Sequence, residues 1–477
     1  MKTIIKKINR IPSSASEVIF VSDIKKIPKE LLSEEELEFA KKEQKNEKDL
    51  IAINRFNKWL FVQIIKNEKI EHKRLEVCRK AGNNILSNIN AQKIKKIYLR
   101  DAEDKSSEIL AFAEGMALGN YQFLKYKTGK DKKENSLTEI YILSKSLEQL
   151  KIDELNIVIE ATCLCRTLVN EPLSFLNAIK LSEAIIDMGK ESGAKVEVLN
   201  KKKIEALKMG GLLAVNKGSI DPPTFSIIEW KPENAINKKP YIFVGKGIVY
   251  DTGGLNIKTG NYMNDMKCDM AGAAMMSSVV YAISKAKLPV YVIALIPATD
   301  NRPDGNAYVS GDVITMFDGT NVEVLNTDAE GRIILADALS YAKKYNPELV
   351  IDSATLTGAA SRAIGKYGIV AMQSKAAKEF GNLKKSGENV YERLAEFPFW
   401  EEFGEMIKSD IADIKNIGGI DARMITAGKF LEHFTDYPFI HLDIAGPAFL
   451  GKKDEYRSAG GTGTGVRLLF DFIRNKC

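Results

Sequence analysis

The chain has 477 residues, of which 45% are hydrophobic and 28% are charged, values typical of a globular protein. Its longest apolar run, Pro289 to Ala298, is too short to cross a bilayer, so we expect no membrane partner. Residues 1–7 lack the apolar core of a signal peptide, and the five cysteines have no disulfide-framework spacing. These features predict a cytoplasmic protein.

The net charge of +6 is unevenly distributed along the chain. Residues 1–150 hold 30 Lys and Arg against 22 Asp and Glu, whereas the remainder holds 39 against 41. A basic first domain could bind nucleic acid. Its lysines are scattered among Glu and Asn, however, and this pattern favours an ordinary solvated surface.

Residues 1–150 alternate strand and helix patterns, so we expect a small N-terminal α/β domain. The expected strands are Glu17–Val21, Lys96–Leu99 and Tyr141–Leu143, and the expected helices are Glu34–Gln63 and Ser107–Tyr126. Within the first helix, the candidate core residues are Phe39, Leu50, Phe56 and Leu60. The domain has no acidic or glycine cluster that indicates chemistry, so its expected role is packing, assembly or regulation.

A linker helix is expected over residues 151–169, and the chain leaves it at Asn170-Glu171-Pro172 because the residue before proline avoids helical geometry. A larger domain, residues 170–477, should follow. Its expected helices are Leu181–Met188 and Lys203–Met209, and its expected strands are Lys195–Leu199, Ser226–Trp230, Tyr241–Val244, Val290–Leu295, Val322–Leu325 and Leu349–Ile351. Continuous apolar strands between helices predict a mixed, mainly parallel sheet covered by helices on both faces. The fold class is therefore α/β with two domains.

The stretch Asn326-Thr327-Asp328-Ala329-Glu330-Gly331-Arg332 lies where a strand pattern gives way to a helix pattern. Ligands bind at such places in open α/β sheets. Asp328 and Glu330 are two residues apart, so both side chains point the same way from an extended or looped backbone. Two acids facing one way repel each other unless a cation lies between them, and a divalent metal ion is the usual cation.

A second stretch, Gly245 to Gly254, follows the Tyr241–Val244 strand and carries Lys246 and Asp251 among four glycines. Lys258 and Asp269 come soon after it. Taken alone, Asp269 could be an N-cap for the helix that follows it. The combination of these residues with Asp328 and Glu330 favours a carboxylate metal site over isolated caps.

Three rival kinds of site are disfavoured. The segment Gly245-Lys246-Gly247 lacks P-loop spacing, and Gly460 to Gly465 lacks Rossmann spacing. The three histidines, His72, His433 and His441, lie outside the acidic stretches, which disfavours a histidine zinc site and a Ser-His-Asp triad. We expect His441, in a strand-like run, to be a structural hydrogen-bonding residue.

Over roughly residues 160–470 these segments resemble the leucyl aminopeptidase (cytosol aminopeptidase) family. The resemblance is carried by residues 244–247, Asp251 with Gly253-Gly254, Met266-Lys267 with Asp269-Met270, and residues 326–332. It implies an aminopeptidase that removes N-terminal residues, with Leu and Met preferred, through a hydroxide bound by two metal ions. The ions would be Mn2+ or Zn2+, with Mg2+ also possible.

The resemblance also implies residue roles. Lys246, Asp251, Asp269 and Glu330 would bind one ion, and Asp251, Asp328 and Glu330 would bind the other. Lys258 would stabilise the oxyanion, and Arg332 would hold a bicarbonate ion that acts as the base; the alternative for Arg332 is a structural salt bridge. The substrate-binding residues would be Met266, Asn326, Ala329, Thr355, Leu356, Gly358 and Ala448.

The resemblance further implies a homohexamer acting on peptides. Three positions depart from the family pattern, namely Ser310, Ile420 and Arg423, and none of them is an expected metal ligand. Two other hypotheses stay open. Some relatives bind DNA, and a catalytically inactive relative would keep only the fold.

Overall fold

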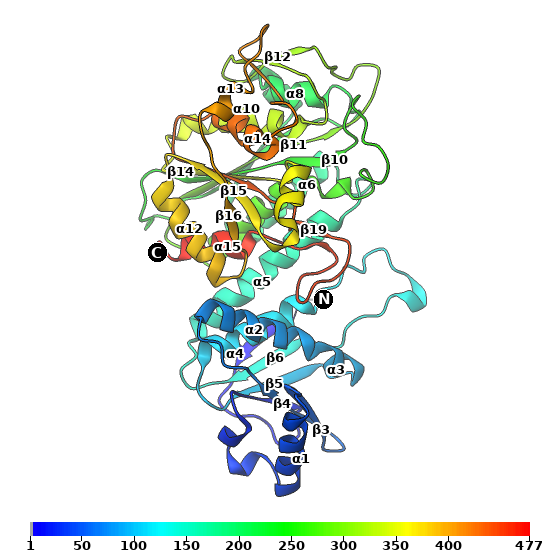
Figure 1. The fold of residues 1–477 in the computed structure, drawn as a ribbon, viewed down its shortest axis with the longest axis vertical. Coiled ribbons are helices and arrows are strands. Elements are labelled where there is room, and N and C mark those ends of the chain that lie inside the picture. The colour runs from blue at the N-terminus through cyan, green and yellow to red at the C-terminus, as the bar shows by residue number, and fades with distance from the viewer. Residues whose placement is uncertain (1–2) are drawn as a thin grey trace. The chain divides into compact units, whose positions relative to one another are not determined.

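The structure is a computed structural model that describes residues 3–477. It divides into two compact units (Figure 1). One unit holds the chain up to Cys163 together with Lys452–Ser458, and the other holds Leu164–Gly451 and Ala459–Cys477. The division falls inside helix α5 (Gln149–Asn170). The domain boundaries expected from the sequence, after residues 150 and 169, stay a prediction.

The first unit is built on a sheet that has six strands within the described residues, in the order β1-β6-β5-β2-β4-β3. All neighbours pair in parallel except β3 and β4, which are antiparallel. The strands are β1 (Ile4–Lys7), β2 (Glu17–Val21), β3 (Leu50–Asn54), β4 (Trp59–Ile64), β5 (Lys96–Asp101) and β6 (Glu139–Leu143). The helices are α1 (Glu34–Lys45), α2 (Glu71–Asn84), α3 (Leu86–Ala91) and α4 (Ser106–Gly119), with short 3-10 turns η1 (Ile24–Lys26), η2 (Lys29–Leu31) and η3 (Gly129–Asp131).

The expected helix Glu34–Gln63 is wrong beyond Lys45. A capping box formed by Ser33 and Glu36 starts α1, and the chain then forms the β3–β4 hairpin. Burial in β3 alternates, with Ile51 and Ile53 facing the core, and this is the period of a strand. Of the expected core residues, Leu60 is buried and Leu50 is half-buried. Phe39 is exposed, and Phe56 is fully exposed at the hairpin turn with a φ of 62°.

The second unit contains a mixed sheet that has nine strands between residues 164 and 477. Its order is β16-β15-β18-β14-β9-β11-β8-β7, with β10 also paired to β11. The central strands β18, β14, β9 and β11 run parallel, as expected, and β7, β8 and β15 introduce antiparallel pairs. The second unit also contains two small sheets, β12-β13-β17 and β19-β20.

The strands of the second unit, in chain order, are β7 (Lys195–Leu199), β8 (Thr224–Trp230), β9 (Tyr241–Gly245), β10 (Gly247–Asp251), β11 (Val292–Asn301), β12 (Val313–Thr315), β13 (Asn321–Glu323), β14 (Leu349–Ala354), β15 (Ile369–Ser374), β16 (Leu394–Glu396), β17 (Ile414–Lys415), β18 (Phe439–Asp443), β19 (Phe449–Leu450) and β20 (Gly460–Gly461). Its helices are α6 (Ala178–Ser192), α7 (Lys201–Ala206), α8 (Gly210–Asn216), α9 (Ala271–Lys285), α10 (Glu330–Ala342), α11 (Gly358–Ile364), α12 (Ala377–Asn389), α13 (Glu402–Glu405), α14 (Arg423–Glu432) and α15 (Val466–Arg474), with 3-10 turns η4 (Met266–Cys268), η5 (Lys343–Tyr345) and η6 (Gly365–Tyr367).

Helices pack on the central strands of this sheet. Helix α9 packs on β9, β11 and β14, and it contacts α6 and α15. Helix α10 packs on β9 and β11 and contacts α8 and α14. Both helices are buried along most of their length. The two-domain α/β fold expected from the sequence is therefore confirmed. None of the helices in residues 3–477 is long and apolar enough to span a lipid bilayer.

His441 lies in the middle of β18 with no solvent exposure, and its Nδ1 is 2.8 Å from Asp352 Oδ2 on the neighbouring strand β14. Such a buried pair is what a structural histidine requires, because a buried polar group without a partner is costly. The expected structural role fits this geometry.

Candidate metal centre

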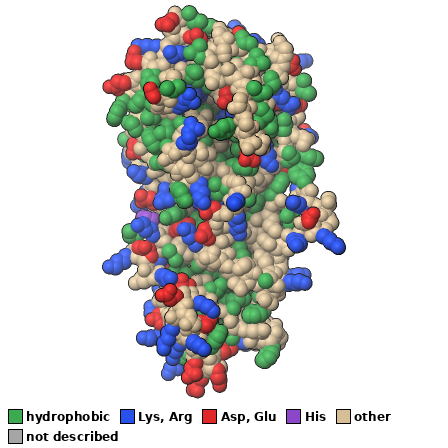
Figure 2. Space-filling model, turned by 45° about the vertical axis from the view of Figure 1, so that its right-hand side comes forward, with side chains coloured by type: hydrophobic (Ala, Val, Ile, Leu, Met, Phe, Trp, Pro, Cys, Tyr) green, Lys and Arg blue, Asp and Glu red, His purple; other side chains and the backbone are tan. Residues whose placement is uncertain are grey.

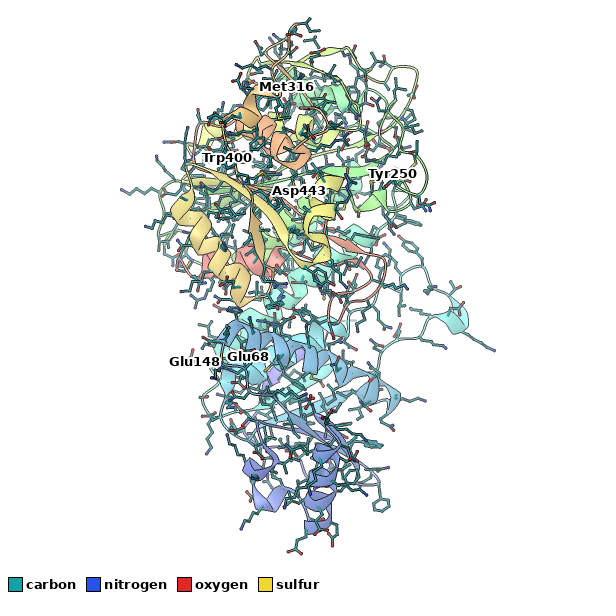
Figure 3. The ribbon with its side chains drawn as sticks, viewed as in Figure 1. Glu68, Glu148, Tyr250, Met316, Trp400 and Asp443 are labelled. Atoms are coloured by element: carbon teal, nitrogen blue, oxygen red, sulfur yellow. The ribbon has the colours of Figure 1, made fainter. Side chains whose placement is uncertain are left out.

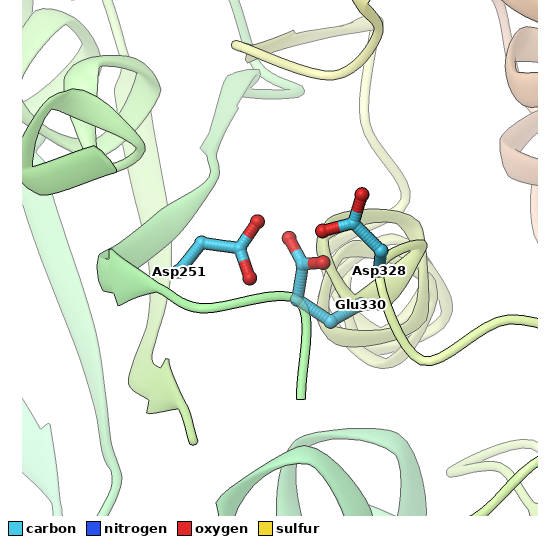
Figure 4. A group of neighbouring side chains, drawn as sticks. All are labelled: Asp251, Asp328 and Glu330. Carbon is cyan, nitrogen blue, oxygen red and sulfur yellow. The ribbon is translucent and has the colours of Figure 1, made fainter. Parts of the chain in front are cut away.

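Three acidic side chains converge at one edge of the larger sheet. Asp251 is the last residue of β10, Asp328 lies in the loop that follows β13, and Glu330 is the first residue of α10. One carboxylate oxygen of each lies within 4.8 Å of the other two, and Figure 4 shows the three groups facing one another. Asp251 and Glu330 are buried, whereas the Asp328 side chain is 34% exposed. The cluster is therefore open to solvent on the Asp328 side.

Two lysines and a fourth acid complete the cluster. Lys246 Nζ lies 2.8 Å from Asp269 Oδ2 and 2.9 Å from Glu330 Oε1. Lys258 Nζ lies 2.7 Å from Asp251 Oδ2 and also pairs with Asp328. The structure thus brings together all five expected metal ligands and Lys258.

Asp269 is not an N-cap. Met270 is the cap residue of α9, and it makes no side-chain capping hydrogen bond. The Asp269 carboxylate instead accepts a hydrogen bond from Thr355 Oγ1 at 2.7 Å and faces Lys246 with its other oxygen. The capping interpretation from the sequence is therefore wrong, because the carboxylate is turned into the cluster.

Burial and mutual repulsion raise the pKa of three of the four acids, whereas Lys246 and Lys258 lower the pKa of Glu330 against the effect of burial. Burial, followed by the nearby Glu330 carboxylate, raises the pKa of Asp251 to about 7, and the same two causes raise the pKa of Asp328. Burial also raises the pKa of Asp269, although Lys246 opposes the shift. Ionising these carboxylates therefore costs free energy, and nearby positive charge reduces that cost.

The pKa of Lys246 is raised as well, but by attraction to the acids and against the effect of burial. Burial alone would lower the pKa of Lys246, but Asp269, Glu330 and Asp251 outweigh it and raise the pKa. The surrounding carboxylates therefore favour the ammonium form of Lys246. The neutral amine needed of a lysine ligand would form only when a cation displaces that proton. Carboxylate oxygens and one amine form a donor set that suits divalent cations, so the residues present fit a metal centre.

Hydrogen bonds between the loops fix the cluster. Thr327 Oγ1 donates to Gly253 O at 2.6 Å, and Thr327 N donates to Asn256 Oδ1 at 2.7 Å. Tyr308 Oη donates to Thr327 O at 2.7 Å. These bonds join the loop after β10 to the loop before α10, so the acids on the two loops are held together. Asn256 and Tyr308 were not expected from the sequence, because their role depends on contacts with Thr327, which lies 71 and 19 residues away.

Gly331 lets Lys246 reach the acids. A Cβ at Gly331 would lie 2.4 Å from Lys246 Cε and 2.5 Å from its Nζ. The glycine of the seven-residue stretch is therefore required by the path of a lysine side chain, and not by a backbone turn.

Arg332 lies on α10 and is buried. Its Nη1 donates to Asn416 O at 2.7 Å, and its Nε has no hydrogen-bond partner among residues 3–477. Within the same residues no carboxylate forms an ion pair with it, so the salt-bridge alternative has no support. Burial lowers the pKa of Arg332 to about 10. A buried guanidinium with a free N–H is suited to receive a small anion.

The expected substrate-binding residues lie at different distances from the cluster. Thr355 contacts Asp269, and Asn326 Oδ1 accepts a hydrogen bond from Asp328 N at 2.8 Å. Ala329 adjoins Glu330 at the start of α10, and Met266 begins the η4 turn that leads to Asp269.

The other three expected substrate residues are Leu356, Gly358 and Ala448. Leu356 N donates to Asp443 Oδ1 at 3.2 Å, and Asp443 ends β18 (Figure 3). Gly358 is the exposed first residue of α11, and Ala448 is buried before β19. In the described chain no hydrogen bond joins these three residues to the cluster.

Comparison with known proteins identifies the chain. The pattern described as "Cytosol aminopeptidase family, catalytic domain" matches residues 163–470, and the pattern of the family's N-terminal domain matches residues 66–130. The chain belongs to the cytosol aminopeptidase family. Family membership makes it a metal-dependent aminopeptidase, and hence a hydrolase that acts on peptides.

Individual members of the cytosol aminopeptidase family cover most of the chain. A "Probable cytosol aminopeptidase" of Chlorobium phaeobacteroides is 45% identical over 376 residues, which are 76% of this chain and 74% of that protein. One of Clostridium perfringens is 39% identical over 415 residues, 84% of each chain.

Two solved structures have a similar fold. The bottromycin maturation enzyme BotP in complex with Mn has a TM-score of 0.86 and 26% identity, and it covers 97% of this chain and 99% of its own. A mutant of tomato leucine aminopeptidase has a TM-score of 0.86 at 24% identity, covering 99% of this chain and 97% of its own, and so shares the fold.

Replacing Gly331 by alanine tests the packing at the cluster. The new methyl group would displace the Lys246 amine from Asp269 and Glu330, so we expect Mn2+ affinity to fall at least about tenfold, in the range that displaced supporting residues cause. Isothermal titration calorimetry would measure the affinity. The fold should survive, since alanine favours a helix over glycine by about 1 kcal/mol.

The matched control is Gly381→Ala on α12, where a Cβ meets open space. It should leave Mn2+ affinity unchanged. If Gly331→Ala bound Mn2+ as tightly as this control, Lys246 would not need its present position.

Proposed function

We propose that the chain hydrolyses the first residue from peptides with a free α-amine, by means of two divalent ions. The observation that carries the proposal is the cluster of four carboxylates and Lys246 at the sheet edge. Lys246, Asp251, Asp269 and Glu330 would hold one ion, and Asp251, Asp328 and Glu330 would hold the other. Mn2+ and Zn2+ are the proposed ions, with Mg2+ also possible. When bound, a pair of such ions supplies an activated water and polarises the carbonyl to be cleaved.

Lys258 is proposed as the oxyanion-stabilising residue. Its ammonium lies at the exposed side of the cluster, between Asp251 and Asp328. The neighbouring carboxylates raise its pKa, although burial opposes them, so the charge is kept at neutral pH. A fixed positive charge at this place would stabilise negative charge that develops on the substrate carbonyl.

Arg332 is proposed to hold a bicarbonate ion. Its unpartnered, buried Nε–H supports this role, because a small anion would satisfy a donor that the protein leaves free. Bicarbonate, when bound, would supply a base beside the reacting water.

The pocket for the first side chain is proposed to be apolar. Met266 and Ala448 would line it, and a flexible thioether beside a small residue suits Leu and Met. Asn326, Ala329, Thr355, Leu356 and Gly358 would contact the peptide. The contacts of Thr355 and Asn326 with Asp269 and Asp328 support their part in this proposal.

Cleavage of leucine amide and of N-acetyl-leucine amide tests the proposed reaction. We expect Mn2+-dependent release of leucine from the free amine alone, because one ion would accept the α-amine. The assay would be run with added Mn2+ and after chelation. Equal cleavage of both compounds, or cleavage that survives chelation, would contradict the proposal.

Two substitutions separate metal binding from rate. Glu330→Ala should lose Mn2+ and activity together, because Glu330 would contact both ions. Lys258→Ala should keep two Mn2+ per chain while kcat falls about 100-fold or more, the usual effect of removing an oxyanion donor. Atomic absorption after gel filtration would count the metal.

Asp337→Asn is the matched control for these two variants. Asp337 is a buried acid on the same helix, and it accepts hydrogen bonds from Leu212 N and Phe317 N away from the cluster. The Asp337→Asn variant should be less stable than the wild type but should bind the same number of Mn2+ ions per chain. Full activity in Glu330→Ala would end the two-metal assignment.

We also propose a homohexamer. The proposal comes from family resemblance, and light scattering should give about six times the 53.0 kDa chain mass. A monomer at assay concentration would contradict it. The cytoplasmic location stays a prediction.

Nucleic-acid binding and an inactive relative have less support. On the face shown in Figure 2, basic side chains lie among acidic ones and form no continuous basic tract. An inactive relative would be expected to lack part of the acidic cluster, whereas every expected ligand is present and turned inward.

A further inference from the structure

Asn301 lies beside the acids of the candidate metal centre without being one of their expected partners. It is the last residue of β11 and is fully buried. Strand β10 runs parallel to β11, and the pairing places Asn301 opposite Asp251. Parallel strands present their carboxyl ends at the same sheet edge, so the amide reaches the cluster directly.

The amide nitrogen of Asn301 faces only hydrogen-bond acceptors. Its Nδ2 lies 2.8 Å from Asp251 Oδ1, 3.0 Å from Thr327 O and 3.5 Å from Glu330 Oε2. Only the amide nitrogen can donate, so these partners determine which way the group points. Its Oδ1 has no hydrogen-bond partner among residues 3–477 and lies against Gly254, where a Cβ would come within 2.8 Å.

These contacts divide the oxygens of Asp251 into two kinds. Oδ1 accepts from Asn301 Nδ2 and from Gly253 N, each at 2.8 Å, and so uses both of its lone pairs. Within residues 3–477 the only side chain that pairs with Oδ2 is Lys258. A cation that displaced Lys258 would therefore find Oδ2 free and Oδ1 occupied.

We propose that Asn301 is a positioning residue that commits Asp251 to bind metal through Oδ2 alone and orients Glu330 beside it. The inference rests on the proposed two-metal function. A neutral donor suits this place because it holds both carboxylates without competing for the space of a cation, as a lysine would.

Asn301→Ala tests the proposal, with metal affinity as the readout. Mn2+ affinity of the full-length, metal-stripped chain should fall about 10- to 100-fold, as when a residue supporting a metal ligand is lost. Calorimetry would measure it, and thermal unfolding of the metal-free chain would report stability separately.

Asn216→Ala is the matched control. Asn216 is also a buried asparagine, and its Nδ2 donates to Asp221 O at 2.8 Å and to Thr299 Oγ1 at 3.0 Å, away from the acids. The Asn216→Ala variant should lose about as much stability as Asn301→Ala and should keep wild-type Mn2+ affinity. Equal Mn2+ affinity in Asn301→Ala and wild type, or an equal loss in both variants, would overturn the proposal.

Asn301→Asp covers the case in which the alanine variant does not fold. The side chain keeps its shape but presents an acceptor to Asp251 Oδ1, so the electron paramagnetic resonance spectrum of the Mn2+-loaded protein should change. An unchanged spectrum and stoichiometry would overturn the proposal. Failure of the wild-type chain to bind Mn2+ would instead refute the proposed function, and the positioning role with it.

Discussion

Repulsion between buried carboxylates is the constraint on which the rest of the site depends. Two unit charges about 4 to 5 Å apart repel by roughly 3 to 4 kcal/mol at an effective dielectric constant near 20. For Asp251, Asp328 and Glu330 the three pairs sum to about 10 kcal/mol, which is comparable with the net stability of a folded domain. The cluster can therefore remain ionised only if positive charge lies among its members. Lys246 and Lys258 provide that charge in the metal-free chain.

The fold explains why these groups meet. Strands β9 and β10 deliver Lys246 and Asp251 to one edge of the sheet, and β11 brings Asn301 to the same edge. Glu330 arrives at the start of α10, where the free N–H groups of the helix favour an anion. Tight packing at Gly331 then places the Lys246 amine beside Glu330. Each contribution is local, but only the pairing of the strands brings the groups together.

The sequence was sufficient to predict the parts of the molecule that have strong local patterns. The apolar strand β9 was placed to within one residue, because burial on both faces leaves a continuous apolar run, whereas the expected strand Leu349–Ile351 covers only the apolar first half of β14. The stretch from Glu34 to Gln63 failed because charged residues and a β-hairpin with a short polar turn resemble a helix in composition. Only the alternation at Ile51 and Ile53 indicated the strand.

The residues of the candidate site also differ in whether the sequence could predict them. Charged residues in unusual local settings, such as Lys246 among glycines, could be found from the sequence. Asn301 and Asn256 could not, because neutral polar residues after apolar strands are common and their partners lie far away in the chain. What distinguishes Asn301 is its neighbours, and these depend on the register of β10 against β11.

The two lysines also explain how four carboxylates can lie together at this edge of the sheet. Each ammonium lies between two carboxylates, as a divalent ion would, and together they carry half the charge of two such ions. Metal that entered the proposed centre would therefore displace the ammonium groups. Lys246 would lose its proton to become a ligand, whereas Lys258 could keep its charge by turning toward solvent, where the Asp328 side is open. The exposure of the two lysines differs accordingly, at 4% and 13% of their side chains. The more buried lysine is thus suited to become a ligand, and the more accessible one is suited to meet the substrate.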